Sequence, residues 1–368
     1  MENKILEILS IVPDPRVERS KLHLLSDILF IALCAVIAGA ETYTEMASFG
    51  KIHFDWFKRF LKLPNGIPSH DTFGRVLSLI DPKALNQCLI DIVGVIREKN
   101  VKDKHIAIDG KTLRRSFNKG QKPIHVISAW ASEHGVVLGQ IKTEEKSNEI
   151  TAIPELINML CLEEALVSID AMGCQKKIAK QILDRKGDYL LALKQNQKAL
   201  YEEVNLFFES DLSEIELSTH KEIDSGHGRI ETRKSTVCRD IDWLQEKENW
   251  PSLRAIIKIE SIREIDGEEQ KETRYYISSK EISAKEALEI SRRHWGIENS
   301  LHWVLDVIFK EDSCRIRKKN GPENMAVLRR MAMNLCKQNK KSKLSMRAQR
   351  KKAGWDIKFL EKLILQKF

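Results

Sequence analysis

The order of short apolar runs between residues 105 and 193 constrains the fold of this chain more than any other feature. Five runs have the length and composition of strands, at 105–109, 124–131, 135–143, 165–170 and 188–193. The turn residues Ser-Glu-His-Gly, which separate the second run from the third, predict a hairpin. Helical patterns begin at Asn148, the expected N-cap, and at Gln175. This β-β-β-α-β-α-β order predicts an α/β fold with a mixed sheet flanked by helices.

The segments on either side of this core have different patterns. Residues 22–40 predict an apolar helix, residues 43–61 predict an amphipathic helix, and Ser69 is the expected N-cap of a third. We interpret the β-like runs at 229–238, 253–262 and 273–278 as an inserted β-rich subdomain, after which helix returns from Ser283 through Phe309. The predicted units are a helical N-terminal domain (1–95), the first part of the α/β core (104–204), the inserted subdomain (205–282), the helices that complete the core (283–336) and a basic helical tail (337–368).

One apolar stretch raises the question of a membrane span. Leu24–Ala40 is 17 residues long and contains Asp27, whereas a span needs about 20 apolar residues and an acid is costly inside a bilayer. A buried helix is therefore favoured over a membrane span.

The seven cysteines are scattered and none forms a C-x-x-C pair, which favours a reducing, cytoplasmic compartment.

Positive charge is concentrated near the C-terminus. The net charge is +8, and residues 315–352 contain 14 Lys or Arg and a single acid, Glu323. A basic concentration of this kind indicates a polyanionic partner, and a solvated tail is the alternative. Within this stretch, residues 322–337 have an apolar face and predict a helix docked on the core.

Three carboxylates on separate predicted elements are candidate metal ligands. Asp109 and Asp170 end two strands, and Glu298 lies on a helix far along the chain. Carboxylates are the ligands that Mg²⁺ prefers, and two such ions can activate a nucleophile and stabilise the leaving oxygen of a phosphodiester. The alternative for each aspartate is a helix cap or a turn former.

The helix around Glu298 carries a polar stripe. The polar residues recur every four positions and share one face: His294, Glu298, His302 and Asp306. Bulky apolar residues flank them, which is typical of a helix that lines a buried site. The two histidines raise the alternative of zinc, although HExxH is absent.

Five motifs carry a resemblance to a known family: IAIDGKTLRRS, VSIDAMGCQ, DYLLALKQNQ, SGHGRIETR and RRHWGIENSLHWVLDVIFKEDSCRIR. They resemble, in order, the blocks of the H-repeat-associated insertion-sequence transposases of the DDE superfamily. The resemblance implies a ribonuclease-H-like catalytic core, catalytic roles for Asp109, Asp170 and Glu298, and two Mg²⁺ or Mn²⁺ ions. The N-terminal run with LPNGIPSHDTFGRV resembles the helical domain that accompanies this core.

The implied activity is metal-dependent nicking at the inverted-repeat ends of an element, followed by strand transfer into target DNA. The implied partner is double-stranded DNA, bound by a homodimer or a larger assembly in the bacterial cytoplasm at the nucleoid. A plain nuclease of the same fold is one alternative. A DNA-binding regulator whose active site has decayed is the other.

Basic and polar residues near the motifs are the expected DNA contacts. Related families carry Tyr and Arg seven and four residues before the glutamate, where this chain has Ser291 and His294, so Arg292 or Arg293 is expected to take the cationic role. The complete set of expected DNA contacts is Lys111, Arg114, Arg115, Lys194, Arg229, Arg292, Arg293, His302, Arg317, Lys340, Lys341, Lys343, Arg350, Lys351 and Lys352.

Overall fold

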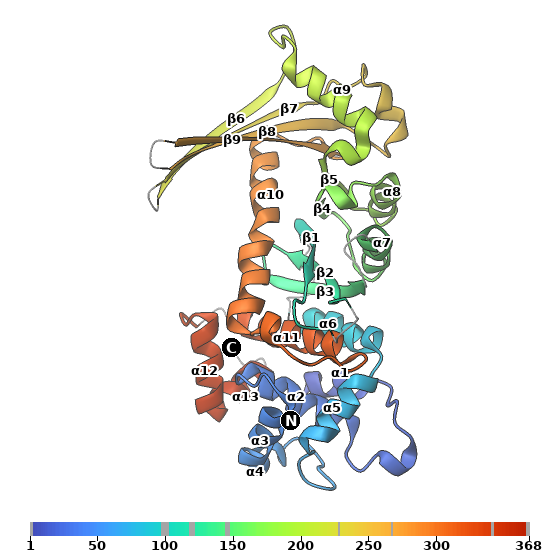
Figure 1. Ribbon diagram of the computed structural model, residues 1–368, viewed down its shortest axis with the longest axis vertical. Coiled ribbons are helices and arrows are strands. Elements are labelled where there is room, and N and C mark those ends of the chain that lie inside the picture. Colours follow the sequence, from blue (N-terminus) through green and yellow to red (C-terminus); the bar gives the residue numbers. More distant parts are fainter. Residues whose placement is uncertain are drawn as a thin grey trace.

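A computed structural model describes residues 3–96, 103–117, 122–143, 148–226, 229–265, 268–339 and 342–365 of the 368-residue chain. Figure 1 shows an elongated molecule with the N-terminal helices at one end and four long strands, β6–β9, overhanging at the other. Helix α10 (Ala284–Ile297) runs lengthwise between the two ends.

The strands form one nine-stranded sheet in the order β3-β2-β1-β4-β5-β9-β8-β7-β6. Its first five strands are β1 (His105–Thr112), β2 (His125–Ala131), β3 (Val136–Thr143), β4 (Leu166–Ile169) and β5 (Asp188–Leu193). β1, β2 and β3 form an antiparallel meander, and β1, β4 and β5 are parallel. With α7 (Glu149–Asn158) and α8 (Lys176–Asp184) between the later strands, the predicted β-β-β-α-β-α-β order is confirmed.

Of two local predictions in this core, one is wrong and the other is confirmed in part. Strand β1 does not end at Asp109 but continues to Thr112, because β2 extends its ladder as far as the pair Thr112–His125. Asp109 therefore stands inside a strand, opposite Ser128. Asn148 precedes α7 as expected, but its side chain makes no capping hydrogen bond.

The β-rich insertion extends the same sheet. It consists of β6 (Ser218–Gly226), β7 (Arg229–Cys238), β8 (Ala255–Ile265) and β9 (Glu268–Ser278). β9 pairs antiparallel with β5, from Leu193–Tyr275 to Leu190–Ser278. The inserted β-rich subdomain is thus hydrogen-bonded to the core, with helix α9 (Lys198–Glu209) leading into it.

Among the described residues, six α-helices precede the sheet: α1 (Lys4–Ser10), α2 (Leu25–Ile37), α3 (Tyr43–Ile52), α4 (Phe54–Phe57), α5 (His70–Leu79) and α6 (Pro82–Ile96). Helix α2 is buried along nearly its whole length, and the carboxylate of Asp27 accepts a hydrogen bond from the Leu63 N–H at 2.9 Å. In the part of the chain that the structure describes, no helix has the length and apolarity that a membrane crossing requires. Ser69 caps α5 through the Thr72 N–H, as predicted.

The amphipathic helix expected over residues 43–61 is interrupted. α3 ends at Ile52, and His53 leaves the helical region before the short α4 begins. The change of direction brings the buried Phe57 against Phe30 and Phe49, with ring centroids 6.3 and 6.1 Å apart. Aromatic packing on the core outweighs the continuity of the helix here.

Helix α11 (Gly321–Lys337) connects the N-terminal helices to the sheet. It is buried along almost all of its length between the N-terminal helices and β3, so it docks on the core as predicted. Asn334 bonds the backbone of Val137 in β3 through both amide atoms, at 2.9 and 2.8 Å. Helices α12 (Met346–Trp355) and α13 (Ile357–Leu365) then pack on α11 and α2.

The long helix expected from Ser283 to Phe309 is not regular throughout. Ser283 caps α10 through the Glu286 N–H, and regular α-helix stops at Ile297. Two π-helical turns follow, Glu298–His302 and Val304–Ile308. Glu298 is the first residue of the wider turns, which are rare in proteins and frequent at functional sites.

Candidate active site

A cavity of about 640 Å³ lies where β1, the end of β4 and the end of α10 meet. It brings together all three expected carboxylates. Its lining residues are Asp109, Gly110, Lys111, Thr112, Arg114, His125, Asp170, His294, Trp295, Ile297, Glu298, Asn299, His302, Trp303, Asp306 and Asp312.

Asp109 is a largely buried carboxylate with a strongly raised pKa. Burial first, and then the nearby carboxylates of Asp170, Glu149 and Glu298, raise its pKa to about 7 against one backbone hydrogen bond from Gly110, which lowers it. A buried acid surrounded by other acids disfavours its own charge until a cation arrives. The electrostatics around Asp109 therefore favour a bound cation.

Asp170 follows β4 directly and performs a structural task as well. Its Oδ1 accepts hydrogen bonds from the N–H groups of Met172 (3.0 Å) and Gly173 (3.3 Å), so it caps the short helix Ala171–Gly173. The capping role that we weighed as an alternative is thus present. These two hydrogen bonds to Oδ1 fix the orientation of the Asp170 carboxylate. The same residue lines the cavity.

The two histidines of the polar stripe are held in neutral form. Burial lowers the pKa of His294 to about 4, and its Nδ1 lies 2.8 Å from the Ser168 hydroxyl. Burial lowers the pKa of His302 to about 3, and its Nδ1 lies 3.8 Å from Asp109 Oδ2. A neutral imidazole is a weak phosphate ligand, so His302 in this state lacks the charge of a DNA contact.

A second buried acid beside Asp109 was missed by the sequence analysis. Glu149, the first residue of α7, accepts a hydrogen bond from His125 Nε2 at 2.6 Å, and both side chains are almost fully buried. The pair packs over Gly110, where a Cβ would lie 2.2 Å from His125 Nε2 and 2.5 Å from Glu149 Oε1. Gly110 is therefore required for this close approach. A glutamate in the first turn of a helix is ordinary, which gave no signal for its role.

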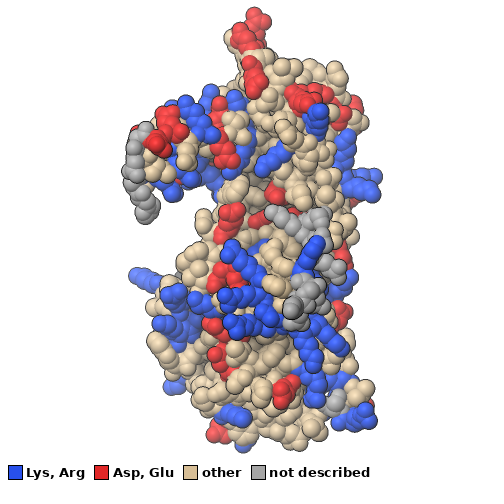
Figure 2. All heavy atoms as spheres, viewed as in Figure 1, with Lys and Arg blue, Asp and Glu red and all other residues tan. Residues whose placement is uncertain are grey.

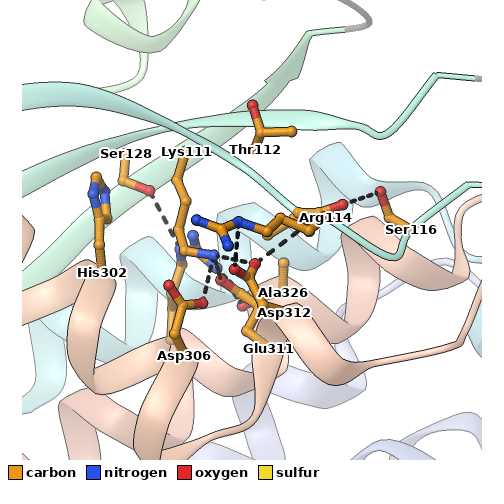
Figure 3. A network of polar contacts seen from close by, with 12 residues as sticks. Lys111, Thr112, Arg114, Ser116, Ser128, His302, Asp306, Glu311, Asp312 and Ala326 are labelled. Carbon is orange, nitrogen blue, oxygen red and sulfur yellow. Dashed lines mark hydrogen bonds and ion pairs between the residues drawn. The ribbon is translucent and has the colours of Figure 1, made fainter.

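Lys111 lies at the centre of an ion-pair network. Its Nζ is 2.7 Å from Asp306 Oδ1, 2.9 Å from Asp312 Oδ1 and 3.5 Å from Glu311 Oε2 (Figure 3). Burial opposes its charge, but these carboxylates outweigh burial and raise its pKa. Lys111 was expected to contact phosphate; in this structure its ammonium is already engaged with three acids.

Three arginines that were expected to contact DNA also form ion pairs with acids. Arg292 reaches Glu222 at 2.7 Å and Asp224 at 3.0 Å, and Arg293 reaches Glu133 at 3.2 Å. Arg229 on β7 pairs with Glu231 at 3.1 Å. These three remain predicted DNA contacts, but each would have to exchange or share a carboxylate partner.

The remaining expected contacts near the cavity are more accessible. The side chain of Arg114 is 81% exposed at the cavity, with Nε 3.2 Å from Asp312 Oδ2. Arg317 donates to the backbone oxygen of the exposed Arg115 at 3.1 Å. Lys194 is exposed in the turn after β5, and Asn196 ties that turn to the Ala171 oxygen beside Asp170.

The basic tail divides into buried and exposed cations. Arg350 is buried: it donates to the backbone oxygens of Val36 and Ile308 and lies over the Phe309 ring. The expectation that Arg350 faces DNA is therefore wrong for this conformation, because its guanidinium fastens α12 to the core. Lys343, Lys351 and Lys352 are exposed, while Lys340 and Lys341 lie outside the described residues. Figure 2 shows Lys and Arg gathered across the middle of the molecule, below the recess under the overhanging strands.

The cavity is not a preformed metal cluster. Within the described ranges, no group of three or more His, Cys, Asp or Glu side chains is arranged to hold a metal ion. Asp109 and Asp170 do lie on or directly after neighbouring parallel strands, and α10 packs on both strands, as predicted. We predicted that the three carboxyl groups converge. They line one cavity but, among the described residues, are not grouped so as to form a metal site.

An acid-lined cavity at a mixed sheet, with one acid supplied by a helix, defines an α/β protein with a carboxylate site. Comparison with known proteins identifies it further. Residues 101–335 match the family model described as a transposase DDE domain, and residues 6–93 match the model described as DDE_Tnp_1-associated. The chain therefore belongs to the DDE transposase family, within its H-repeat-associated branch.

Relatives cover nearly the whole chain. The "H repeat-associated putative transposase YhhI" of Escherichia coli K12 is 42% identical over 98% of this chain and 97% of its own length. The "Putative transposase YncI" of Escherichia coli O157:H7 is 44% identical over 98% of this chain and 94% of its own. A solved structure of a piggyBac transposase synaptic complex with hairpin DNA aligns over 99% of this chain and 77% of the piggyBac chain, at 11% sequence identity. Its TM-score of 0.43 is too low to define a shared fold.

Proposed function

We propose that this transposase nicks DNA at the inverted-repeat ends of its element and joins the freed 3′-hydroxyls to target DNA. The observation that carries the proposal is the single cavity lined by Asp109, Asp170 and Glu298, each from a different element. Family membership supplies the reaction class, and the cavity supplies residues suited to it.

The donor chemistry of the cavity fits a hard divalent cation. The three side chains are carboxylates, and the raised pKa of Asp109 reflects its burial and then the negative charge of neighbouring acids. Asp109, Asp170 and Glu298 would hold Mg²⁺ or Mn²⁺, as two ions. Bound ions of this kind activate the attacking oxygen and stabilise the leaving oxygen of a phosphodiester.

The chain's own residues would prepare the site for this chemistry. The Asp170 carboxylate is oriented by the two N–H groups that it caps, and β1 presents Asp109 beside it. The π turn that begins at Glu298 leaves this carboxylate at the end of regular helix, where small changes of backbone can bring it closer to the aspartates. The absence of a preformed cluster among the described residues is accounted for by closure on binding of metal and DNA.

The strand order β3-β2-β1-β4-β5 supports a ribonuclease-H-like core as the part that carries these residues. The antiparallel meander followed by parallel strands places Asp109 in the middle of the five strands and Asp170 on its neighbour. Strands β6–β9 are then an extension of this core at the β5 edge.

Exposed cations on and before α12 supply a surface for duplex DNA. Lys343, Lys351 and Lys352 are exposed, and none of the ion pairs that the structure describes involves them. Exposed cations outside these ion pairs are available to neutralise phosphates, in a manner indifferent to base sequence, although Lys352 also lies over the Phe359 ring at 4.9 Å. We expect two or more copies of the chain to assemble on a pair of element ends.

The test is a cleavage and joining assay on labelled duplexes copied from the DNA that flanks the gene, with Mg²⁺ or Mn²⁺. Asp109→Asn, Asp170→Asn and Glu298→Gln should each abolish cleavage while binding persists, because each removes a charged metal ligand and keeps the shape. Asp55→Asn, at a side chain 96% exposed, is the matched control. Near-normal cleavage by any of the three variants removes that residue from the site. Cleavage without joining indicates a plain nuclease, and binding without cleavage indicates a decayed regulator.

A further inference from the structure

Lys111 supplies the positive charge at the centre of three acids, which within the described residues are not themselves arranged as a metal site while the lysine is in place. Its ammonium lies within 3.5 Å of three carboxylates, from Asp306, Glu311 and Asp312. The Lys111 side chain is 7% exposed and that of Glu311 is fully buried. Three carboxylate oxygens around one centre are the kind of environment in which proteins bind hard divalent cations. Here the cation is part of the chain.

The lysine and its acids come from opposite sides of the cavity. Lys111 follows Asp109 by two residues on β1, so the two side chains are on the same face of the sheet. Asp306 belongs to the second π turn after Glu298, and Glu311 and Asp312 lie in the short helix that follows. The ion pairs therefore connect the strand that carries Asp109 to the segment that continues from Glu298.

A second cation strengthens the same connection. Arg330 on α11 is fully buried and binds Glu311 Oε1 through Nη1 at 2.9 Å. Its Nε donates to the Ser128 hydroxyl at 3.3 Å, and Ser128 is the residue opposite Asp109 in the β1–β2 ladder. Figure 3 shows the Ser128, Lys111 and Arg114 side chains reaching toward the acids from the sheet side.

We propose that Lys111 is a positioning residue that acts as a built-in cation: it sets the distance between Asp109 and Glu298, and it keeps divalent ions off Asp306 and Asp312. Both acids line the same cavity as the three proposed ligands and would otherwise compete for the ions. This inference rests on the proposed function, because it assumes that Asp109, Asp170 and Glu298 bind metal.

The first experiment counts bound Mn²⁺ by electron paramagnetic resonance, without DNA, in the parent and in Lys111→Met. The variant should bind one additional ion, because Asp306, Glu311 and Asp312 lose their internal cation. The same extra ion should be absent from Lys111→Met combined with Asp306→Asn and Asp312→Asn. An unchanged count in folded Lys111→Met overturns the built-in cation. A parent that binds no Mn²⁺ at all overturns the proposed function instead.

The second experiment measures the Mg²⁺ concentration that gives half-maximal cleavage. In the triple variant, in which one positive and two negative charges are removed, this concentration should rise by about 10-fold or more, the usual effect of losing a residue that orients metal ligands. Lys111→Arg should restore most of the Mg²⁺ affinity, since a guanidinium can pair with the same acids. Lys186→Met, at a lysine 79% exposed, is the matched control. A parent-like Mg²⁺ dependence in the triple variant overturns the positioning role, whether or not Lys111→Met folds.

Discussion

Helices α11 and α12 belong to the same basic stretch of sequence and use their positive charge in opposite ways. Arg330 of α11 is fully buried, paired with Glu311 and bonded to Ser128. Lys351 and Lys352 of α12 are exposed, and the described ion pairs include neither. A count of cations along the sequence does not separate these cases. Burial and the presence of an acid partner decide whether a cation stabilises the fold or remains available to a polyanion.

The largest effect is expected where the buried pair of α11 is broken. Arg330→Met should lower the free energy of unfolding by about 3–5 kcal/mol, because the Glu311 charge stays buried without this partner. Urea denaturation measures the loss. Arg330→Met combined with Glu311→Gln should recover much of it, and DNA affinity per folded molecule should be unchanged in both. A single variant as stable as the parent would show that this buried charge contributes nothing to the fold.

Asp109 contrasts with Arg330. Arg330 is a buried charge paired with an acid, whereas Asp109 is a largely buried acid surrounded by other acids. Without metal, Asp109→Asn should stabilise the protein at pH 8 by up to about 4 kcal/mol, at about 1.4 kcal/mol for each unit by which the folded pKa of about 7 exceeds the ordinary aspartate pKa of 3.8. The raised pKa makes ionisation of Asp109 costly to the folded state. This cost is complete above pH 7, falls as the pH decreases from 7 to 4, and is absent below that.

Denaturation in the presence of a chelator at pH 8 and at pH 4.5 measures this difference. The gain should be small at the lower pH, and Mg²⁺ should reduce it at pH 8 by stabilising the parent alone. Asp55→Asn, at an exposed carboxyl, should show no comparable pH dependence. Equal stability of Asp109→Asn and the parent at pH 8 would contradict the crowding of acids around Asp109.

The smallest effect on the fold is expected at the exposed cations. Lys343, Lys351 and Lys352 changed together to Gln should leave the unfolding free energy within about 0.5 kcal/mol of the parent, as surface substitutions usually do. Affinity for specific and random duplexes should fall alike. The slope of log affinity against log salt should flatten by up to about 0.9 for each phosphate that the variant no longer neutralises. A matched triple change at Lys177, Lys180 and Lys186, exposed on and after α8, is the control. An unchanged slope would remove α12 from the DNA surface.

The sequence predicted those parts of the fold that local patterns determine. The first five strands are buried apolar runs, and Ser69 and Ser283 cap their helices as expected. β6 was missed because its alternating, mostly exposed residues include no apolar run. The break after α3 and the π turns after α10 depend on packing partners far along the chain, which no local pattern reports.

The candidate site was predictable to the same extent. The three carboxylates could be found because each is part of a recognisable motif, and the cavity does contain them. The partners of Lys111 lie about 200 positions away, and Glu149 meets His125 only through the packing of α7 on β2. Contacts of this kind arise from the tertiary fold. For the same reason the sequence could not separate the buried Arg350 from its exposed neighbours.

The hydrogen bonding of β9 to β5 has a mechanical consequence for α10. The start of this helix is attached to the overhanging strands, and its end carries Glu298 into the cavity. Its 14 residues make a rod about 21 Å long at 1.5 Å per residue. A tilt of about 5° at the strand end would move the other end by about 2 Å over that length. A displacement of the overhanging strands would thus move Glu298, unless the packing of α10 on β1 and β4 absorbs it.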